Sequence, residues 1–168
     1  WHDLPLDVPF GISRGTTERS GNVVVRVTDE DGTVGIGGGA PVDYYGEDRK
    51  SVTAVMPDLL AVVEDVGDPH QLQRIERRLR AVVGDATSDP AARSAVSVAL
   101  HDLVCKRLDV PLSRYWGLDP ERRVTSSFTI GLADTDAMAD RAAETVDAGY
   151  SILKVKLGTD RDREIVEA

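Results

Sequence analysis

The sequence predicts an α+β region followed by the opening of a larger α/β structure. β-Branched residues at 22–28 and 33–37, joined by Asp31-Gly32, are typical of a hairpin, and helical patterns follow them. From Val124 onward the pattern changes to strand, amphipathic helix and strand, which is a β-α-β unit. Two parallel strands do not form a stable sheet alone, so this part is expected to belong to a larger α/β fold.

The N-terminal segment is predicted to be extended at residues 5–10 and to form a polar loop that could move at residues 11–21. The glycine-rich segment 35–40 nearly fits a dinucleotide-binding motif, but Pro41 stands where a phosphate-facing helix should begin. A nucleotide site is therefore rejected. The glycines are expected to allow a bend or bulge at the end of the strand.

Three helices are predicted between the two strand regions. The first begins near Glu47, is interrupted at Pro57 and resumes over 59–63, and the second covers 69–83. The third is expected to begin at Pro90 with Asp89 as its cap. It carries a narrow stripe of small apolar residues, which favours close packing: Ala92, Ala95, Val96, Ala99 and Leu103. Beside the stripe lie His101 and Asp102, for which packing or hydrogen bonding is favoured over catalysis.

The C-terminal elements are predicted from the change in periodicity after the third helix. They are a strand at 124–130, a helix at 135–148 that ends at Gly149, a strand at 151–157, and a further helix from 160 to 168.

Composition limits the class of protein and its partners. The formal net charge of −9 argues against nucleic-acid binding. No run approaches the ~18 apolar residues that span a bilayer, and the first residues lack a secretory pattern, so no membrane partner and a cytoplasmic location are expected. Aspartate is abundant and lysine scarce, a balance suited to a high-salt cytoplasm, so a halophilic origin is a hypothesis.

Cys105 is the single cysteine of the chain, so an internal disulfide and a thiolate metal cluster are excluded. The residue is expected to be a small core side chain. His101, four residues before it, is interpreted as a helical neighbour, so a nucleophilic role is not favoured.

Lys154 and Lys156 are two of only four lysines, and they lie two residues apart on an otherwise apolar strand. Their side chains are expected to share one face, about 7 Å apart, together with Ile152. Strands of a parallel sheet are buried on both faces, and there burial and the neighbouring cation would favour the neutral amine, which can accept a proton. The alternative is an edge strand whose lysines face water and discourage aggregation.

Short motifs follow one another in a specific order along nearly the whole chain. They are Pro9-Phe10, Gly35-x-Gly37, Ala40-Pro41, Tyr45-Gly46-Glu47, Ala99-Leu100-His101-Asp102-Leu103, Pro111-Leu112, Thr129-Ile130-Gly131 and Lys154-Val155-Lys156-Leu157-Gly158. This series resembles the N-terminal portion of the enolase superfamily. Within that superfamily it resembles the muconate lactonizing enzyme and mandelate racemase-like proteins, and most closely the dipeptide (L-Ala-D/L-Glu) epimerases.

The resemblance implies an α+β N-terminal capping domain at residues 1–120, followed at 121–168 by the first β/α units of a TIM-like (β/α)-barrel that is truncated here. It implies an isomerase that abstracts the proton α to a carboxylate through a metal-stabilised enediolate. The expected partner is a small-molecule carboxylate such as a dipeptide, the expected cofactor is Mg²⁺, and a homo-oligomer is expected.

The resemblance also assigns roles to individual residues. Lys156 would exchange the α-proton, and Lys154 would assist it and help to neutralise the anion. Thr129 matches a position that touches the dipeptide backbone. Arg14 matches the region that recognises the substrate side chain, which implies an acidic side chain, although a solvated loop arginine is the alternative.

Two departures from the family pattern qualify this interpretation. Gly38 replaces an acidic residue of the family's Gly-x-Gly-Glu motif, a change expected to affect local packing more than proton transfer. The acidic metal ligands and the second catalytic lysine of such enzymes come from later strands, so no metal ligand is assigned in this chain. A muconate or chloromuconate cycloisomerase, or a non-catalytic fragment that lacks the metal site, remain the alternatives.

Overall fold

The computed structural model describes residues 1–84 and 90–168, which form two compact units. One unit consists of Trp1–Leu4 and Gly21–Pro120, and the other consists of Pro5–Ser20 and Glu121–Ala168. The second unit therefore combines part of the N-terminal hairpin with the C-terminal part of the chain. The predicted fold class, an α+β region followed by β/α units, is confirmed.

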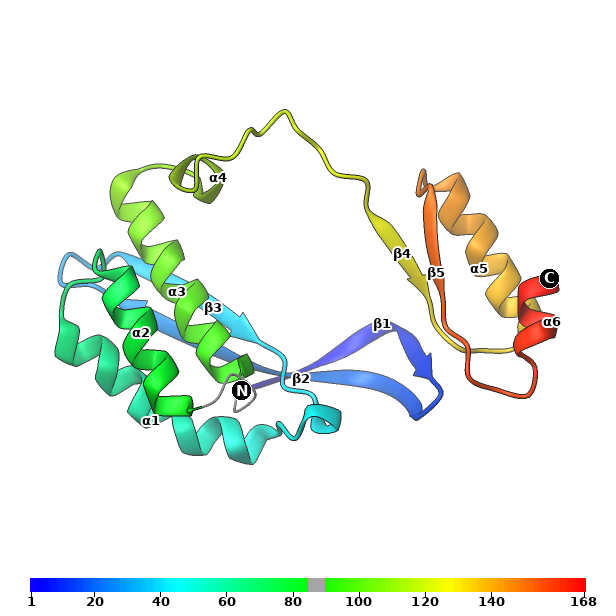
Figure 1. The fold of residues 1–168 in the computed structure, drawn as a ribbon, viewed down its shortest axis with the longest axis horizontal. Helices are drawn as coiled ribbons and strands as arrows, with labels where there is room; N and C mark the ends of the chain where they lie inside the picture. Colours follow the sequence, from blue (N-terminus) through cyan, green and yellow to red (C-terminus); the bar gives the residue numbers. More distant parts are fainter. Residues whose placement is uncertain (85–89) are drawn as a thin grey trace. The chain divides into compact units, whose positions relative to one another are not determined.

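The order of strands and helices is drawn in Figure 1. Up to residue 120 the elements are β1 (His2–Ile12), β2 (Gly15–Thr28), β3 (Val34–Gly39), the 3₁₀ helix η1 (Asp43–Tyr45), α1 (Arg49–Val66), α2 (Leu72–Val83), α3 (Pro90–Leu108) and α4 (Leu112–Tyr115). After it they are β4 (Ser127–Ile130), α5 (Thr135–Asp147), β5 (Ile152–Val155) and α6 (Asp162–Glu167). One sheet has the order β1-β2-β3, and the other pairs β4 with β5.

The polar segment at residues 11–21 is not the loop that was predicted. Strand β1 continues to Ile12 and strand β2 begins at Gly15, so only the two residues Ser13 and Arg14 connect them. The prediction was wrong because polar residues were taken to mean loop. Hydrogen bonding between neighbouring strands satisfies the backbone of such a segment even where its side chains are exposed.

Helix α1 runs through Pro57 without interruption, contrary to the predicted break. Proline removes one backbone hydrogen bond, at a cost of about 3 kcal/mol. The helix nevertheless buries Val52, Leu59 and Val62 against the core, and each buried side chain contributes roughly 1.5–3 kcal/mol. Burial on both sides of the proline therefore outweighs the lost bond.

The remaining boundaries differ little from the predictions. Helix α2 starts three residues late because Asp68 accepts a hydrogen bond from the backbone N–H of His70 and forms a turn. Helix α3 begins at Pro90 as predicted, while its expected cap, Asp89, lies outside the described residues. The predicted C-terminal strands and helices are all present with shorter ends.

Three alternate glycines of β3 bring this strand into backbone contact with α3. A Cβ atom built on Gly35, Gly37 or Gly39 would overlap the main chain of α3. The atoms concerned are the carbonyl oxygens of one alanine per helical turn: Ala99, Ala95 and Ala91. The pairing of β3 with β2 is regular from Val34 to Gly39, so the predicted bend or bulge is wrong. The glycines instead permit close packing of a helix on a strand.

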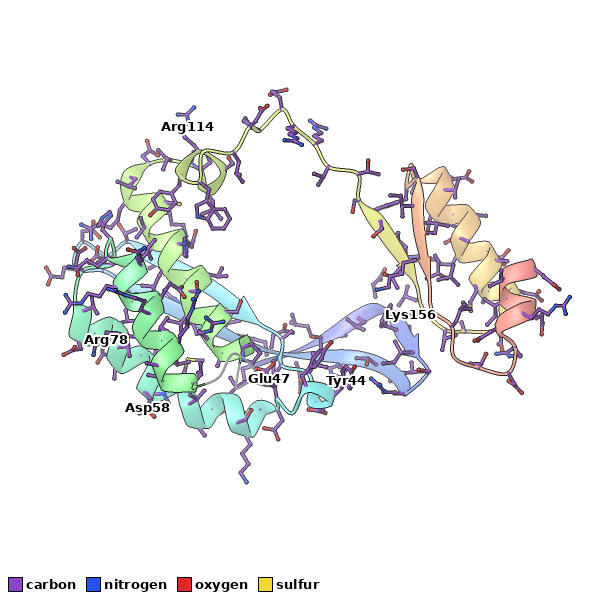
Figure 2. All side chains as sticks on the ribbon, viewed as in Figure 1. Tyr44, Glu47, Asp58, Arg78, Arg114 and Lys156 are labelled. Carbon is purple, nitrogen blue, oxygen red and sulfur yellow. The ribbon has the colours of Figure 1, made fainter. Side chains whose placement is uncertain are left out.

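Glu47, labelled in Figure 2, fixes the start of α3 from a distant part of the chain. Its side chain is only 4% exposed, and its Oε1 atom accepts a hydrogen bond of 2.8 Å from the backbone N–H of Ala91. The first N–H groups of a helix have no partner within the helix. Glu47 therefore satisfies one of them where burial would otherwise make it costly.

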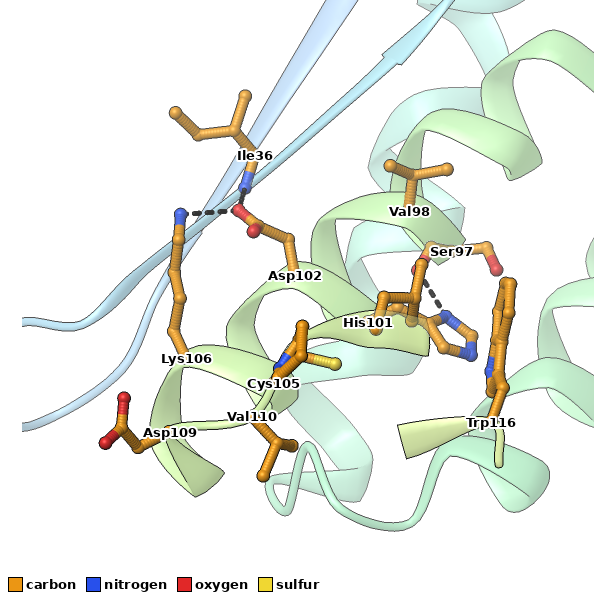
Figure 3. A pocket seen from close by; sticks show the side chains of 12 residues that line it. Ile36, Ser97, Val98, His101, Asp102, Cys105, Lys106, Asp109, Val110 and Trp116 are labelled. Carbon is orange, nitrogen blue, oxygen red and sulfur yellow. Dashed lines mark hydrogen bonds and ion pairs between the residues drawn. The ribbon is translucent and has the colours of Figure 1, made fainter. Parts of the chain in front are cut away.

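The free edge of β3 is bonded to side chains of α3 (Figure 3). The backbone N–H of Ile36 donates to Asp102 at 2.8 Å, and Lys106 donates to both Asp102 and the carbonyl oxygen of Val34. Desolvation acts to raise the pKa of Asp102, but its hydrogen bonds with Lys106 and Ile36 hold that pKa below its usual range. These bonds occupy groups that an edge strand would otherwise offer to another chain.

The hydrophobic core of the first unit lies between the sheet and helices α1, α2 and α3. The predicted α3 stripe is confirmed, because all five of its residues are buried. Its largest fully buried partners on the other two helices are Leu59, Ile75 and Leu79.

In the second unit α5 and α6 cover one face of the parallel sheet, through Ile130, Met138 and Ile165. Within residues 1–84 and 90–168, no helix combines the length and apolar character required to cross a bilayer.

We predict that Gly37→Ala destabilises the protein by about 1–3 kcal/mol, because its methyl group would collide with α3. Gly38→Ala is the matched control, since the nearest atom to a Cβ there is 3.9 Å away and that change should be neutral or slightly stabilising. Urea unfolding of the two variants measures the difference. Equal midpoints for both would contradict the close-contact interpretation.

Candidate active site

Thr129 and Lys154 lie side by side on adjacent parallel strands. Thr129 on β4 is the Cα partner of Lys154 on β5. Neighbouring positions Phe128 and Ile130 belong to the core with α5 and α6. Because side chains alternate along a strand, Thr129 and Lys154 are on the sheet face opposite to these helices. Lys154 is exposed there, so the burial of both strand faces that was expected is not observed.

Lys156 follows the last residue of β5 (Figure 2). Its backbone N–H donates to the carbonyl oxygen of Ile130 at 3.0 Å, which extends the parallel pairing one step beyond the strand. The residue is half-buried, in contrast to Lys154. The backbone bond fixes Lys156 at the carboxyl ends of both strands, the edge where α/β folds bind their ligands.

The turn that carries Arg14 is held against the same edge. The carbonyl oxygen of Gly11 accepts a hydrogen bond of 2.9 Å from the backbone N–H of Leu132, which follows β4. On the other side, a Cβ built on Gly158 would lie 2.9 Å from the Cβ of Ser13. Arg14 therefore belongs to the same compact unit as the two lysines and Thr129, although it comes from the other end of the chain.

The loop after Lys156 is organised by Asp162, a residue that the sequence prediction missed. Its carboxylate accepts hydrogen bonds of 2.8 Å from the backbone N–H groups of Thr159 and Gly158. The bond from Thr159 contributes most to holding the pKa of Asp162 below its usual range, and the bond from Gly158 adds to this effect. The sequence held only a weak signal, a Thr-x-x-Asp spacing that resembles a capping box, because α6 begins at Asp162 itself with Arg161 at its N-cap position.

A cavity of about 820 Å³ lies along β4 within the second unit. Phe10 and Thr17 from the hairpin, Thr129 from β4, and Met138 and Arg141 from α5 are among its lining residues. Lys154, Lys156 and Arg14 do not line it. Of the four residues predicted for the site, this cavity therefore contacts only Thr129.

No metal site is evident in the part of the chain that the structure describes. Among residues 1–84 and 90–168, no three histidine, cysteine, aspartate or glutamate side chains are grouped to hold a metal ion. Divalent cations such as Mg²⁺ need several oxygen ligands, including carboxylates. The described residues therefore do not fit a complete Mg²⁺ site, and any such site would need ligands beyond them.

A second cavity, of about 630 Å³, lies on α3 and α4 in the first unit (Figure 3). His101 lies at its wall, where its Nδ1 atom is 2.8 Å from the carbonyl oxygen of Ser97 and its ring meets that of Trp116 edge-on. Cys105 also lines it but is buried, as predicted. Burial raises the pKa of the Cys105 thiol, and the charge of Asp102 adds to this shift. This environment opposes a nucleophilic role.

The structure thus shows an α+β unit followed by β/α units, with two lysines at the end of a parallel strand. The chain belongs to the mandelate racemase / muconate lactonizing enzyme family. Residues 2–117 match the N-terminal domain of that family, so the predicted resemblance is confirmed.

Curated relatives and solved structures resemble the whole chain. It is 36% identical to an L-Ala-D/L-Glu epimerase from Bacteroides thetaiotaomicron over 99% of this chain and 42% of the relative. A dipeptide epimerase from Methylococcus capsulatus, solved with Mg and L-Arg-D-Lys, has a TM-score of 0.82 at 29% identity, covering 99% of this chain and 47% of that one.

A third similarity is to a protein of different activity. The 2-chloromuconate cycloisomerase from Rhodococcus opacus has a TM-score of 0.86 at 26% identity, covering 98% of this chain and 45% of that one. In all three comparisons the chain spans less than half the length of the protein it matches.

We predict that Cys105 reacts with iodoacetamide far more slowly in the native protein than after unfolding in urea, because the thiol is buried and its pKa is raised. Intact mass spectrometry measures the reaction, and a single adduct identifies this residue since the chain has one cysteine. Rapid labelling of the native protein at neutral pH would contradict the assignment of Cys105 to the core.

Proposed function

We propose that the full-length protein containing this chain is an isomerase that removes the proton α to a carboxylate, and specifically a dipeptide epimerase. The observation that carries the proposal is the grouping of Lys154, Lys156, Thr129 and the Arg14 turn in one compact unit. The similarity to an L-Ala-D/L-Glu epimerase supports this choice of substrate class.

In this proposal Lys156 removes the α-proton from one face of the substrate. A primary amine can take up a proton when it is neutral, and a position at a strand end lets it reach a reactant while the backbone stays fixed. Lys154 contributes positive charge close to the anion that forms. The group that returns a proton to the opposite face comes from outside this chain.

Thr129 and Arg14 bind the substrate in the same proposal. The hydroxyl of Thr129 can hydrogen-bond the peptide group of a dipeptide. The guanidinium group of Arg14 can form a bidentate pair with a side-chain carboxylate, which gives preference for an acidic second residue such as glutamate.

The proposed cofactor is Mg²⁺, a choice supported by the metal bound in the Methylococcus capsulatus structure. When bound beside the substrate carboxylate, such an ion supplies positive charge that stabilises the anion. The described residues do not complete a site for it, so no step assigned to this chain depends on the ion.

Several wider statements stay predictions for the full-length protein. They are a capping domain at 1–120 and barrel units at 121–168, a homo-oligomer, a cytoplasmic location and a halophilic origin. A muconate or chloromuconate cycloisomerase is the second candidate function, favoured by the structural similarity to the Rhodococcus opacus enzyme. A non-catalytic fragment is the third possibility.

We predict that the full-length protein with Mg²⁺ incorporates deuterium at the α-carbon of the glutamate residue of L-Ala-L-Glu in D₂O. Lys156→Ala should lower this rate about 10²–10⁴-fold, the usual contribution of a general base. Lys50→Ala, which removes an exposed lysine of α1, is the control and should not change it. Mass spectrometry and NMR measure exchange and epimerisation.

Two results would count against the proposal. Absence of exchange with any dipeptide, together with turnover of a muconate to a lactone, would favour the cycloisomerase. Full epimerisation activity in Lys156→Ala would remove this lysine from the mechanism, because inversion needs the groups on both faces of the substrate.

We predict that Arg14→Gln lowers kcat/KM for L-Ala-L-Glu by about 10–100-fold, because a charge-assisted hydrogen bond contributes about 1.5–3 kcal/mol. Activity on a neutral dipeptide such as L-Ala-L-Ala should change little. Arg19→Gln, on strand β2 of the same hairpin, is the matched control. A similar loss for acidic and neutral dipeptides would show that Arg14 does not recognise the side chain.

A further inference from the structure

The carboxylate of Asp162 is bonded to the turn between Lys156 and α6 at several points. Its Oδ1 atom accepts from the backbone N–H of Gly158 and of Thr159, both at 2.8 Å, and from the hydroxyl of Thr159 at 3.1 Å. Its Oδ2 atom lies 3.0 Å from the same N–H of Gly158. The carboxylate therefore fixes two successive peptide groups.

Gly158 is the residue through which this bonding affects the candidate site. Its φ of +123° is a conformation that side-chain-bearing residues rarely adopt, so the turn depends on glycine. Gly158 is two residues after Lys156, and its Cα faces Ser13, the residue before Arg14. A shift of this turn would therefore move both the proposed base and the turn that carries Arg14.

The neighbouring residue joins the same turn to the loop after β4. The guanidinium group of Arg161 donates to the carbonyl oxygen of Ala133 at 3.4 Å and lies 3.6 Å from the carboxylate of Asp134. Leu132, just before them, donates to Gly11 of the hairpin. Three segments that are distant in sequence thus meet around the turn that Asp162 holds.

We propose that Asp162 is a positioning residue, which holds the turn at Gly158 and Thr159 so that Lys156 and the Arg14 turn keep their places at one substrate. The inference rests on the proposed function, because it assigns Lys156 and Arg14 to a common reactant. Asp162 touches neither the substrate nor the reacting atoms in this proposal and acts only through the backbone.

A purely local role is the competing explanation. In it the Asp162 carboxylate only satisfies backbone N–H groups of the turn before α6, which accounts for the bond to Thr159, and its removal costs stability. The competing explanation does not require the second bond, from the N–H of Gly158. It also predicts no change in the turnover of the folded enzyme. The two explanations differ in kcat, because misplacing a reacting group by about 1 Å can reduce the rate about 10²-fold.

The test compares three variants of the full-length protein with Mg²⁺ and L-Ala-L-Glu. Asp162→Ala should lower kcat for α-proton exchange about 10–100-fold and also raise KM, because the Arg14 turn that binds the substrate shifts as well. Asp162→Asn, which keeps one acceptor oxygen, should recover part of this loss. Asp160→Ala removes an exposed carboxylate from the same loop, with the same change in charge, and should match the wild type.

Amide hydrogen exchange at Gly158 and Thr159, followed by NMR or mass spectrometry, gives a readout that does not need activity. Both amides should lose protection in Asp162→Ala and keep it in Asp160→Ala. If the wild type exchanges no α-proton of a dipeptide, the proposed function fails. Loss of amide protection in Asp162→Ala would then show only that Asp162 stabilises the turn.

Wild-type kcat in folded Asp162→Ala, or unchanged protection of both amides, would overturn the positioning role. Should Asp162→Ala fail to fold, Asp162→Asn decides the question. A drop in its kcat with normal thermal stability supports the role, and an unchanged kcat overturns it.

Discussion

The contact between β3 and α3 is the constraint on which the first unit depends. The strand has glycine at every second position, and the helix has alanine at every fourth position. No large side chain therefore separates the two backbones. A helix this close to an edge strand can bond the strand's free groups with its own side chains, as Asp102 and Lys106 do. It also brings Val96 and Leu100 into the core with α1 and α2.

The second unit also depends on close contacts at glycines. Gly11 approaches the main chain of Leu132 so closely that a Cβ there would overlap its carbonyl oxygen. Gly158 lies against the side chain of Ser13, whose Cβ would be 2.9 Å from a Cβ built on the glycine. Close approach at these two points joins the hairpin to the loops after β4 and β5. Residues from both ends of the chain thereby enter one compact unit, which sequence order alone does not suggest.

Sequence patterns predicted the elements whose side chains carry the signal. The apolar stripe of α3 and the β-α-β order after Val124 have periodicities that follow from helix and strand geometry. The same approach failed at Pro57, where tertiary burial outweighs a local preference, and at residues 11–21, where backbone pairing defines the strand. It also misjudged the glycines of β3, because their function is to lack a side chain beside a helix that lies far along the chain.

At the candidate site, too, some residues could be predicted from the sequence and others could not. Paired lysines on an apolar strand are unusual enough to be found from the sequence, and the resemblance to a family added Thr129 and Arg14. Asp162 was missed because it was treated as part of the helix predicted at 160–168, although its carboxylate accepts from backbone N–H groups of the turn before α6. Residues that act through the main chain leave weak sequence patterns. Their importance becomes visible only when the turn they hold is seen between Lys156 on one side and Ser13 on the other.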